Sequence, residues 1–121
     1  MAPSRVAIID DDDSLRTALV GFVKSFGYDV DGFASAEDFL AAGPDCGCIV
    51  TDIHMGGLSG IDLKQELSRR GDATPVIMIT ARDEAGLEQR ARASGAACYL
   101  RKPFDAGDLI RCIETALSVP T

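Results

Sequence analysis

The stretch Cys48-Ile49-Val50-Thr51-Asp52-Ile53-His54-Met55, near the middle of the chain, decides how the rest of the sequence is interpreted. It runs from apolar residues into a single carboxylate, Asp52, and is followed by Gly56 and Gly57. A short β-branched run is typical of a buried strand, and the glycines indicate the loop that leaves it. Asp52 is too far from the helix expected at Gly60 to cap it. Because α/β sheets place ligands at strand tips, Asp52 is the first candidate functional residue.

Further apolar segments on either side have the pattern of strands, and segments with helical spacing separate them. Leu15, Leu19 and Phe22, for example, recur at helical spacing. We expect strands over 5–9, 28–33, 48–53, 76–80 and 97–100, and helices over 14–26, 35–42, 60–70, 84–94 and 105–117. Strands and helices alternate five times without a hairpin signal. This predicts an α/β fold, a five-stranded, doubly wound parallel sheet with helices on both faces.

Length, composition and charge narrow the class of protein. At 121 residues the chain is expected to form one domain, residues 1–121, with a core over about 5–117 and a possible linker starting at 118–121. A net charge of −7 argues against binding to nucleic acid or to an anionic membrane surface. Because there is no signal-peptide pattern and no apolar run of about 20 residues, we expect a cytoplasmic protein that does not span a membrane.

The four cysteines are not spaced as a zinc site. Cys46 and Cys48 form a Cys-x-Cys pair, but Cys98 and Cys112 are distant and no histidine lies at ligand spacing. Cys48, Cys98 and Cys112 fall within apolar patterns, so we expect small buried side chains there. Cys46 lies in a loop and is the candidate for an exposed thiol.

Polar residues stand at the end of four of the expected strands. Asp10 and Asp11 follow the first strand, Asp52 ends the third, Thr80 ends the fourth and Lys102 follows the fifth. In an open parallel sheet these ends lie at one edge, so the side chains should converge. Grouped carboxylates repel one another, and Mg²⁺ with oxygen ligands would relieve the repulsion. Asp52 could then attack a phosphoryl group in line, with Lys102 and Thr80 binding its other oxygens.

The sequence resembles a known family, the receiver domain of two-component response regulators, over roughly Val6 to Leu117. The resemblance rests on four motifs: Ile9-Asp10-Asp11-Asp12, Val50-Thr51-Asp52-Ile53-His54-Met55, Ile79-Thr80-Ala81 and Tyr99-Leu100-Arg101-Lys102-Pro103-Phe104. It implies a flavodoxin-like strand order of 2-1-3-4-5. Residues 35–40 and the short strand before Asp52 resemble FixJ-type regulators in particular, in which a helix-turn-helix domain follows the receiver.

The resemblance implies a role for each matching acidic residue. Asp52 would be the phospho-acceptor and also a metal ligand. Asp11 would bind Mg²⁺ directly, Asp10 would bind it through water, and the backbone carbonyl of His54 would be a further ligand.

The same resemblance implies roles for residues at the ends of the last two strands. Thr80 and Lys102 would bind the phosphoryl group, and a cis peptide bond would precede Pro103. Thr80 and Tyr99 would form a switch pair whose side chains reorient on phosphorylation. The alternative for Tyr99 is an aromatic residue at the edge of the sheet with no role in switching.

Positions near the acceptor differ among family members or depart from the family pattern. The side chains of His54 and Arg82 are expected to tune dephosphorylation. Gly56 stands where the family usually has proline, so a looser loop is expected there. Asp12 and Asp13 lengthen the acidic run and are interpreted as charges at a helix N-terminus rather than ligands.

The expected function is a signalling switch, not an enzyme that turns over other substrates. A sensor histidine kinase would phosphorylate Asp52, and the surface around residues 80–105 would change shape. The helix over 84–94 has only Leu87 as a large apolar residue, which suits a segment that moves. The family often forms homodimers through the fourth helix, fifth strand and fifth helix. We expect either a receiver separated from a C-terminal output domain, such as a DNA-binding domain for transcription regulation, or a stand-alone receiver.

Two other functions use some of the same residue types. A haloacid-dehalogenase-type phosphatase also uses Asp, Thr, Lys and Mg²⁺, but its nucleophile lies in the first motif, whereas here the acidic pair comes first and Asp52 third. A flavodoxin-like FMN-binding protein would need a glycine- and hydroxyl-rich phosphate loop after the first strand, where this chain has Asp10-Asp11-Asp12-Asp13.

Overall fold

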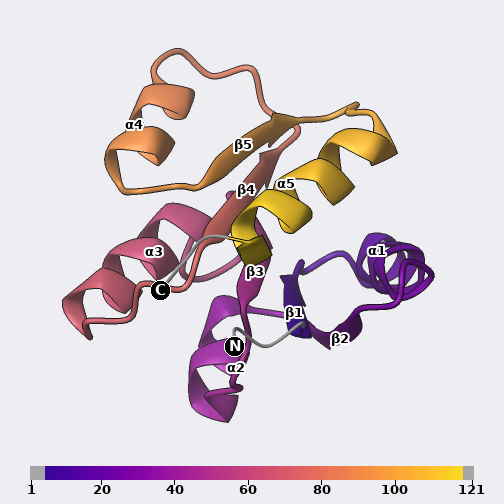
Figure 1. Ribbon diagram of the computed structural model, residues 1–121. Helices are drawn as coiled ribbons and strands as arrows, with labels where there is room; N and C mark the ends of the chain where they lie inside the picture. The colour runs from indigo at the N-terminus through magenta and orange to yellow at the C-terminus, as the bar shows by residue number, and fades with distance from the viewer. Residues whose placement is uncertain (1–4, 119–121) are drawn as a thin grey trace.

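Five parallel strands form one sheet in the order β2-β1-β3-β4-β5, in a computed structural model that describes residues 5–118 (Figure 1). The strands are β1 (Arg5–Ile9), β2 (Asp29–Phe33), β3 (Cys48–Asp52), β4 (Val76–Thr80) and β5 (Cys98–Arg101). The apolar residues of β1, β3 and β4 are all buried, because helices cover both faces of the sheet. β2 and β5 are the edge strands and are more exposed. The predicted doubly wound order is confirmed.

The helices divide between the two faces of the sheet. They are α1 (Asp13–Lys24), α2 (Ala36–Ala42), α3 (Gly60–Arg69), α4 (Leu87–Ala93) and α5 (Ala106–Ser118). Figure 1 shows α1 and α5 on one side of the sheet and α2, α3 and α4 on the other, and each group packs its own layer of the hydrophobic core. Among residues 5–118, no helix is long and apolar enough to cross a membrane. Ser118 ends α5, and residues 119–121 of the predicted linker lie outside the described residues.

Side-chain caps fix where three helices begin. Asp12 is the N-cap of α1, and its carboxylate accepts a hydrogen bond from the Leu15 amide at 3.1 Å. Ser35 caps α2 in the same way. Ser59 and Asp62 form a capping box at the start of α3. Asp12 therefore serves as a charge at a helix N-terminus, as the sequence predicts.

Helix α4 is shorter than the helix expected over 84–94. It begins at Leu87, after Gly86 at a φ of 79°, and no side chain caps it. Glu84 precedes the helix, within the loop that leaves β4. Leu87 and Ala91 are the residues that α4 buries against the sheet. Leu87 is the one large apolar residue of this segment, so the sequence has no apolar repeat that marks where the helix begins.

The prediction of small buried side chains at Cys98 and Cys112 is wrong. The two residues form a disulfide between β5 and α5, with Cα atoms 6.2 Å apart, and both are half-buried. The apolar pattern around each cysteine reports burial, but it does not reveal that the two elements place these side chains face to face. Cys48 is a buried free thiol as predicted, and the free thiol of Cys46 is half-buried.

Candidate functional site

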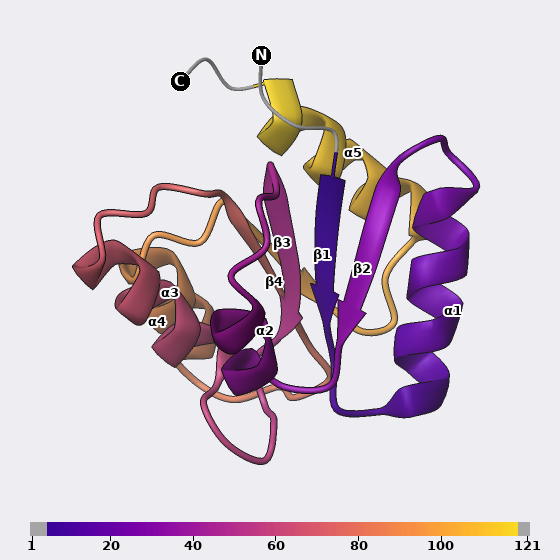
Figure 2. The ribbon, with the colours of Figure 1, turned by 90° about the horizontal axis from the view of Figure 1, so that it is seen from below.

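The predicted site residues lie at the edge of the sheet where the parallel strands end. Figure 2 shows β1, β2 and β3 pointing the same way, with the loops after β1 and β3 at that edge. The register pairs Ile9 with Thr51, Asp52 with Ile79, and Thr80 with Arg101. Side chains from β1, β3, β4 and the end of β5 therefore meet there, as the alternating sequence pattern predicts.

Asp52 and Lys102 form an ion pair at the centre of this edge. Lys102 Nζ lies 3.3 Å from Asp52 Oδ2, although the residues are 50 positions apart in the sequence. The other oxygen, Oδ1, accepts a hydrogen bond from the His54 amide at 3.1 Å. The Asp52 side chain is 14% exposed, so it is oriented by two donors yet reachable from solvent. The peptide bond between Lys102 and Pro103 is cis, which confirms that prediction.

Asp10 adds a buried carboxylate next to this pair. Its residue is 3% exposed, and its Oδ1 accepts a hydrogen bond from the Asp12 amide at 2.9 Å. Burial raises the pKa of Asp10; the Asp12 amide and Lys102 oppose this, and the charges of Asp52 and Asp11 add to it. Asp10, Asp11 and Asp52 are three carboxylates acting in this region against the one ammonium group of Lys102, which leaves an excess of negative charge. A bound cation would relieve this excess.

The donor atoms at the site suit Mg²⁺ better than a softer metal. Asp11 is exposed in the turn after β1, and Asp10, Asp52 and the carbonyl of His54 offer oxygen atoms. Across residues 5–118, no three His, Cys, Asp or Glu residues are grouped as a ready-made metal site. Mg²⁺ commonly keeps several waters and takes few protein ligands, so a ligand set completed by water and a carbonyl fits this chemistry. The assignment of these four residues as ligands stays a prediction.

Thr80 and His54 connect the acceptor loop to the loop after β4. The Thr80 side chain is buried, and its Oγ1 lies 3.3 Å from His54 Nδ1 and accepts a hydrogen bond from the Arg82 amide at 3.0 Å. On its other side, His54 Nε2 lies 4.0 Å from a carboxylate oxygen of Glu84. The Arg82 side chain itself is exposed. The sequence gives no signal for the Glu84 contact, because Glu84 reads as one polar residue of a polar helix.

The glycine-containing loop after Asp52 has a restraint that the sequence does not reveal. The exposed residue Glu37, on α2, accepts a hydrogen bond from the Leu58 amide at 3.2 Å. A side chain at Gly57 would overlap the Glu37 carboxylate. At Gly60, an added Cβ would lie 2.8 Å from the carbonyl oxygen of Asp52. Glycine at these two positions therefore permits close contact with neighbouring groups, while nothing lies within 4 Å of an added Cβ at Gly56.

Tyr99 lies on β5, at the side of the sheet covered by α2, α3 and α4. Its ring is half-buried and packs against the core layer on that face. Burial, and next the charge of Glu88, raise the pKa of its hydroxyl. On the surface nearby, Arg101 pairs with Asp83 at 3.0 Å, which joins β5 to the loop after β4. Tyr99 therefore stands beside the segment that the switch hypothesis requires to move.

Comparison with known proteins agrees with the fold. The family model of the response regulator receiver domain matches residues 6–114. The chain belongs to this family. Receiver domains of two-component response regulators work with histidine kinases, and phosphorylation and Mg²⁺ binding are general to them.

Two curated relatives of this receiver domain are transcriptional regulatory proteins. FixJ of Azorhizobium caulinodans is 42% identical over 114 residues, covering 93% of this chain and 54% of FixJ. TdiR of Thauera aromatica is 38% identical over 118 residues, covering 96% of this chain and 52% of TdiR. The receiver domain described here thus spans about half the length of the curated relatives it matches.

Solved structures give the same result. The crystal structure of FixJ-N superposes with a TM-score of 0.91 at 32% identity, covering 100% of this chain and 98% of that one. The response regulator StyR superposes with a TM-score of 0.87 at 36% identity, covering 97% of this chain and 60% of StyR. The expected resemblance to FixJ is confirmed in both sequence and fold.

Proposed function

We propose that this receiver domain accepts a phosphoryl group on Asp52 from the phosphohistidine of a sensor kinase. One observation carries the proposal: the Asp52 carboxylate is held between Lys102 Nζ at 3.3 Å and the His54 amide at 3.1 Å, at a partly exposed position. A nucleophile must be oriented and reachable, and the group it attacks must find positive charge beside it. Asp52 has all three.

The chemistry is a phosphoryl transfer in which the atoms balance. A carboxylate oxygen of Asp52 attacks phosphorus, the bond from phosphorus to the kinase imidazole nitrogen breaks, and an acyl phosphate forms. Lys102 compensates charge on the phosphoryl oxygens. Asp10, Asp11, Asp52 and the His54 carbonyl would hold Mg²⁺, which when bound neutralises charge on those oxygens. Hydrolysis of the acyl phosphate returns the domain to its starting state, so no other substrate is turned over.

The switch follows from where the Thr80 hydroxyl lies before phosphorylation. Its partners are His54 and the Arg82 amide. We propose that a phosphoryl group on Asp52 draws the hydroxyl toward it, that Tyr99 reorients with it, and that the surface around residues 80–105 changes. Next to that segment, the side chains of His54 and Arg82 would set the access of water to the phosphoryl group and thereby the rate of its loss.

The consequence would be a change in protein contacts. We propose a homodimer formed through α4, β5 and α5 on phosphorylation, in a cytoplasmic protein. In a longer chain the same change would control a C-terminal output domain. This follows the curated relatives, which are about twice as long as the matched region and are transcriptional regulators. The receiver domain itself, with its net charge of −7, is not the part expected to bind DNA.

Labelling with acetyl phosphate and Mg²⁺, measured as intact mass, tests the proposal. The native chain should gain one phosphoryl group, and Asp52→Asn should gain none. Asp12→Asn is a matched control, because asparagine still caps α1 and the site is otherwise unchanged. Labelling that persists in Asp52→Asn would exclude Asp52 as the acceptor. Rapid turnover of a small phosphomonoester without labelling would instead favour a phosphatase.

A further inference from the structure

The disulfide between Cys98 and Cys112 lies away from the candidate phosphoryl site and joins the edge strand β5 to helix α5. Cys98 is the first residue of β5, and Cys112 lies in the middle of α5. Their Cα atoms are 6.2 Å apart, within the range of roughly 4.4–6.8 Å that a disulfide needs. The backbone therefore holds the two side chains at bonding distance without movement of either element.

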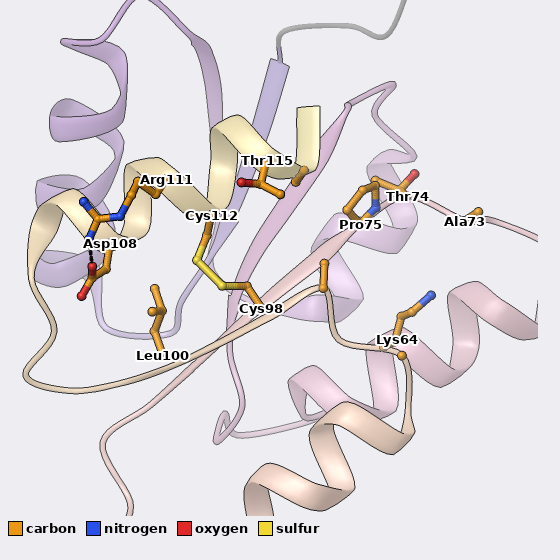
Figure 3. A pocket seen from close by; sticks show the side chains of 13 residues that line it. Lys64, Ala73, Thr74, Pro75, Cys98, Leu100, Asp108, Arg111, Cys112 and Thr115 are labelled. Atoms are coloured by element: carbon orange, nitrogen blue, oxygen red, sulfur yellow. Dashed lines mark hydrogen bonds and ion pairs between the residues drawn. A yellow bond between two sulfur atoms is a disulfide. The ribbon is translucent and has the colours of Figure 1, made fainter. Parts of the chain in front are cut away.

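The two cysteines are only half-buried, so part of each residue is in contact with solvent. Both cysteines line a groove of about 550 Å³ between α5 and the start of β4 and β5 (Figure 3). Lys64 from α3 and Arg111 from α5 also line this groove, and Arg111 pairs with Asp108. A groove of this size admits a small molecule. Because Asp108 also lines the groove and pairs with Arg111, the net charge of the lining is that of Lys64, which suits a molecule that carries a carboxylate.

The disulfide also closes a covalent loop over residues 98–112, which includes residues of the candidate site. The cysteines are 14 residues apart, and the segment between them carries both Tyr99 and Lys102. Oxidation therefore joins β5 to α5 by a covalent bond, and Lys102 lies in the loop that this bond closes. Reduction leaves the two elements joined by packing alone.

We propose that Cys98 and Cys112 form a reversible redox site that exchanges with a small carboxylate-bearing thiol such as glutathione. This inference does not depend on phosphorylation of Asp52. In the oxidising direction, the thiolate of one cysteine attacks a sulfur of the glutathione disulfide and releases one glutathione thiolate. The second cysteine then attacks the mixed disulfide and releases the other. Two protein thiols are oxidised, and one glutathione disulfide is reduced to two thiols.

The other two cysteines provide an internal comparison. Burial raises the pKa of Cys46 to about 11 and that of Cys48 to about 12, so both stay thiols near neutral pH. Since the thiolate is the species that reacts, these two residues should exchange slowly. In a reducing compartment, disulfides are uncommon and usually serve redox reactions, which favours a reversible role for the Cys98–Cys112 pair over a permanent one.

Counting free thiols after equilibration with glutathione tests the redox site. The chain has four cysteines, so unfolding and alkylation should add four groups after excess reduced glutathione and two after glutathione disulfide. Peptide mapping should then locate the bond between Cys98 and Cys112. Four groups under both conditions, two under both conditions, or a bond that includes Cys46 or Cys48 would each overturn the proposal.

Thermal unfolding of matched variants tests the covalent link between β5 and α5. Closing a loop of this length should raise the melting temperature of the oxidised native chain by on the order of 10 °C over the reduced chain. Cys46→Ser should keep this difference and Cys112→Ser should lose it. Equal melting temperatures of the oxidised and reduced native chain, or a difference that persists in Cys112→Ser, would contradict the proposed link.

Discussion

His54 Nδ1 lies 3.3 Å from the hydroxyl oxygen of Thr80, so the side chain two residues beyond the candidate acceptor holds the hydroxyl expected to bind the phosphoryl group. The Thr80 hydroxyl has a second partner, the Arg82 amide, at 3.0 Å. It can therefore leave His54 without losing every hydrogen bond. This contact opposes the rearrangement proposed for the switch by the energy of one hydrogen bond, about 0.5–1.5 kcal/mol.

His54→Ala should therefore increase the rate of labelling by acetyl phosphate, by about 2- to 10-fold, because Thr80 is no longer held. The measurement is the time course of intact mass. Thr80→Val supplies the double-mutant cycle, since His54→Ala should have no effect on the rate when the hydroxyl is absent. The same acceleration in both backgrounds would mean that His54 acts through water access and not through Thr80.

Lys102→Met should lower the labelling rate by about 100-fold, because the ammonium group beside Asp52 Oδ2 no longer compensates charge on the phosphoryl oxygens. Lys24→Met, at an exposed position in the last turn of α1, is the matched control and should label at the native rate. An equal loss in both variants would point to a general effect of net charge on the anionic donor.

Mg²⁺ should raise the melting temperature of the native chain, because a cation that binds only the folded state stabilises it. Asp10→Asn keeps an acceptor for the Asp12 amide and removes one buried charge. It should reduce the shift caused by Mg²⁺ and raise the melting temperature in the absence of metal. Asp13→Asn, which changes a carboxylate paired with Arg16, is the control and should respond to Mg²⁺ as the native chain does.

Gly60→Ala should lower the free energy of unfolding by about 1–3 kcal/mol, because its Cβ would lie 2.8 Å from the Asp52 carbonyl oxygen. Gly21→Ala, in α1, has no atom within 4 Å of the added Cβ and should stabilise the chain by about 0.5–1 kcal/mol. Urea titration of both variants measures the difference. If both substitutions change the free energy of unfolding in the same direction, the close approach of α3 to the end of β3 does not determine whether position 60 accepts a side chain.

The stability of α3 should depend on pH through Glu66. Hydrogen bonds from Arg69 and Arg70 lower the pKa of Glu66 from 4.5 to about 2. A carboxyl group with a lowered pKa stabilises the folded state above its unfolded pKa, and this contribution disappears as the pH falls from 4.5 to about 2. Glu66→Gln should thus be slightly less stable than the native chain at neutral pH and equal to it in strong acid. Because Arg69 and Arg70 are exposed and Glu66 is only half-buried, salt should reduce the difference at neutral pH.

The sheet and its polar edge could be predicted from the sequence because each follows from a pattern of neighbouring residues. Buried parallel strands are apolar runs, and Asp52, Thr80 and Lys102 follow such runs directly. The parallel arrangement then brings the ends together without any knowledge of contacts. This is why the Asp52–Lys102 pair was within reach of sequence reasoning although 50 residues separate its members.

Contacts between elements that share no local pattern could not be predicted. The Cys98–Cys112 bond depends on the angle at which α5 crosses β5, and neither segment encodes that angle alone. Glu37 reaches the Leu58 amide from another helix, which restrains a loop that its glycines suggest is loose. The start of α4 at Leu87 could not be predicted because Leu87 is the one large apolar residue of the segment, and a single apolar residue gives no periodic signal.

The order in which the site residues occur along the chain has a consequence for protein synthesis. Asp10 is made early, whereas Lys102 comes after all five strands, and the last of them, β5, pairs only with β4. When Asp52 has left the ribosome but residues 98–102 have not, the nascent chain lacks the Lys102 ammonium group that faces the Asp52 carboxylate. The candidate site is thus completed only when the last strand joins the sheet. Under the proposed function, a chain that lacks residues 98–102 should therefore be a poor acceptor of the phosphoryl group.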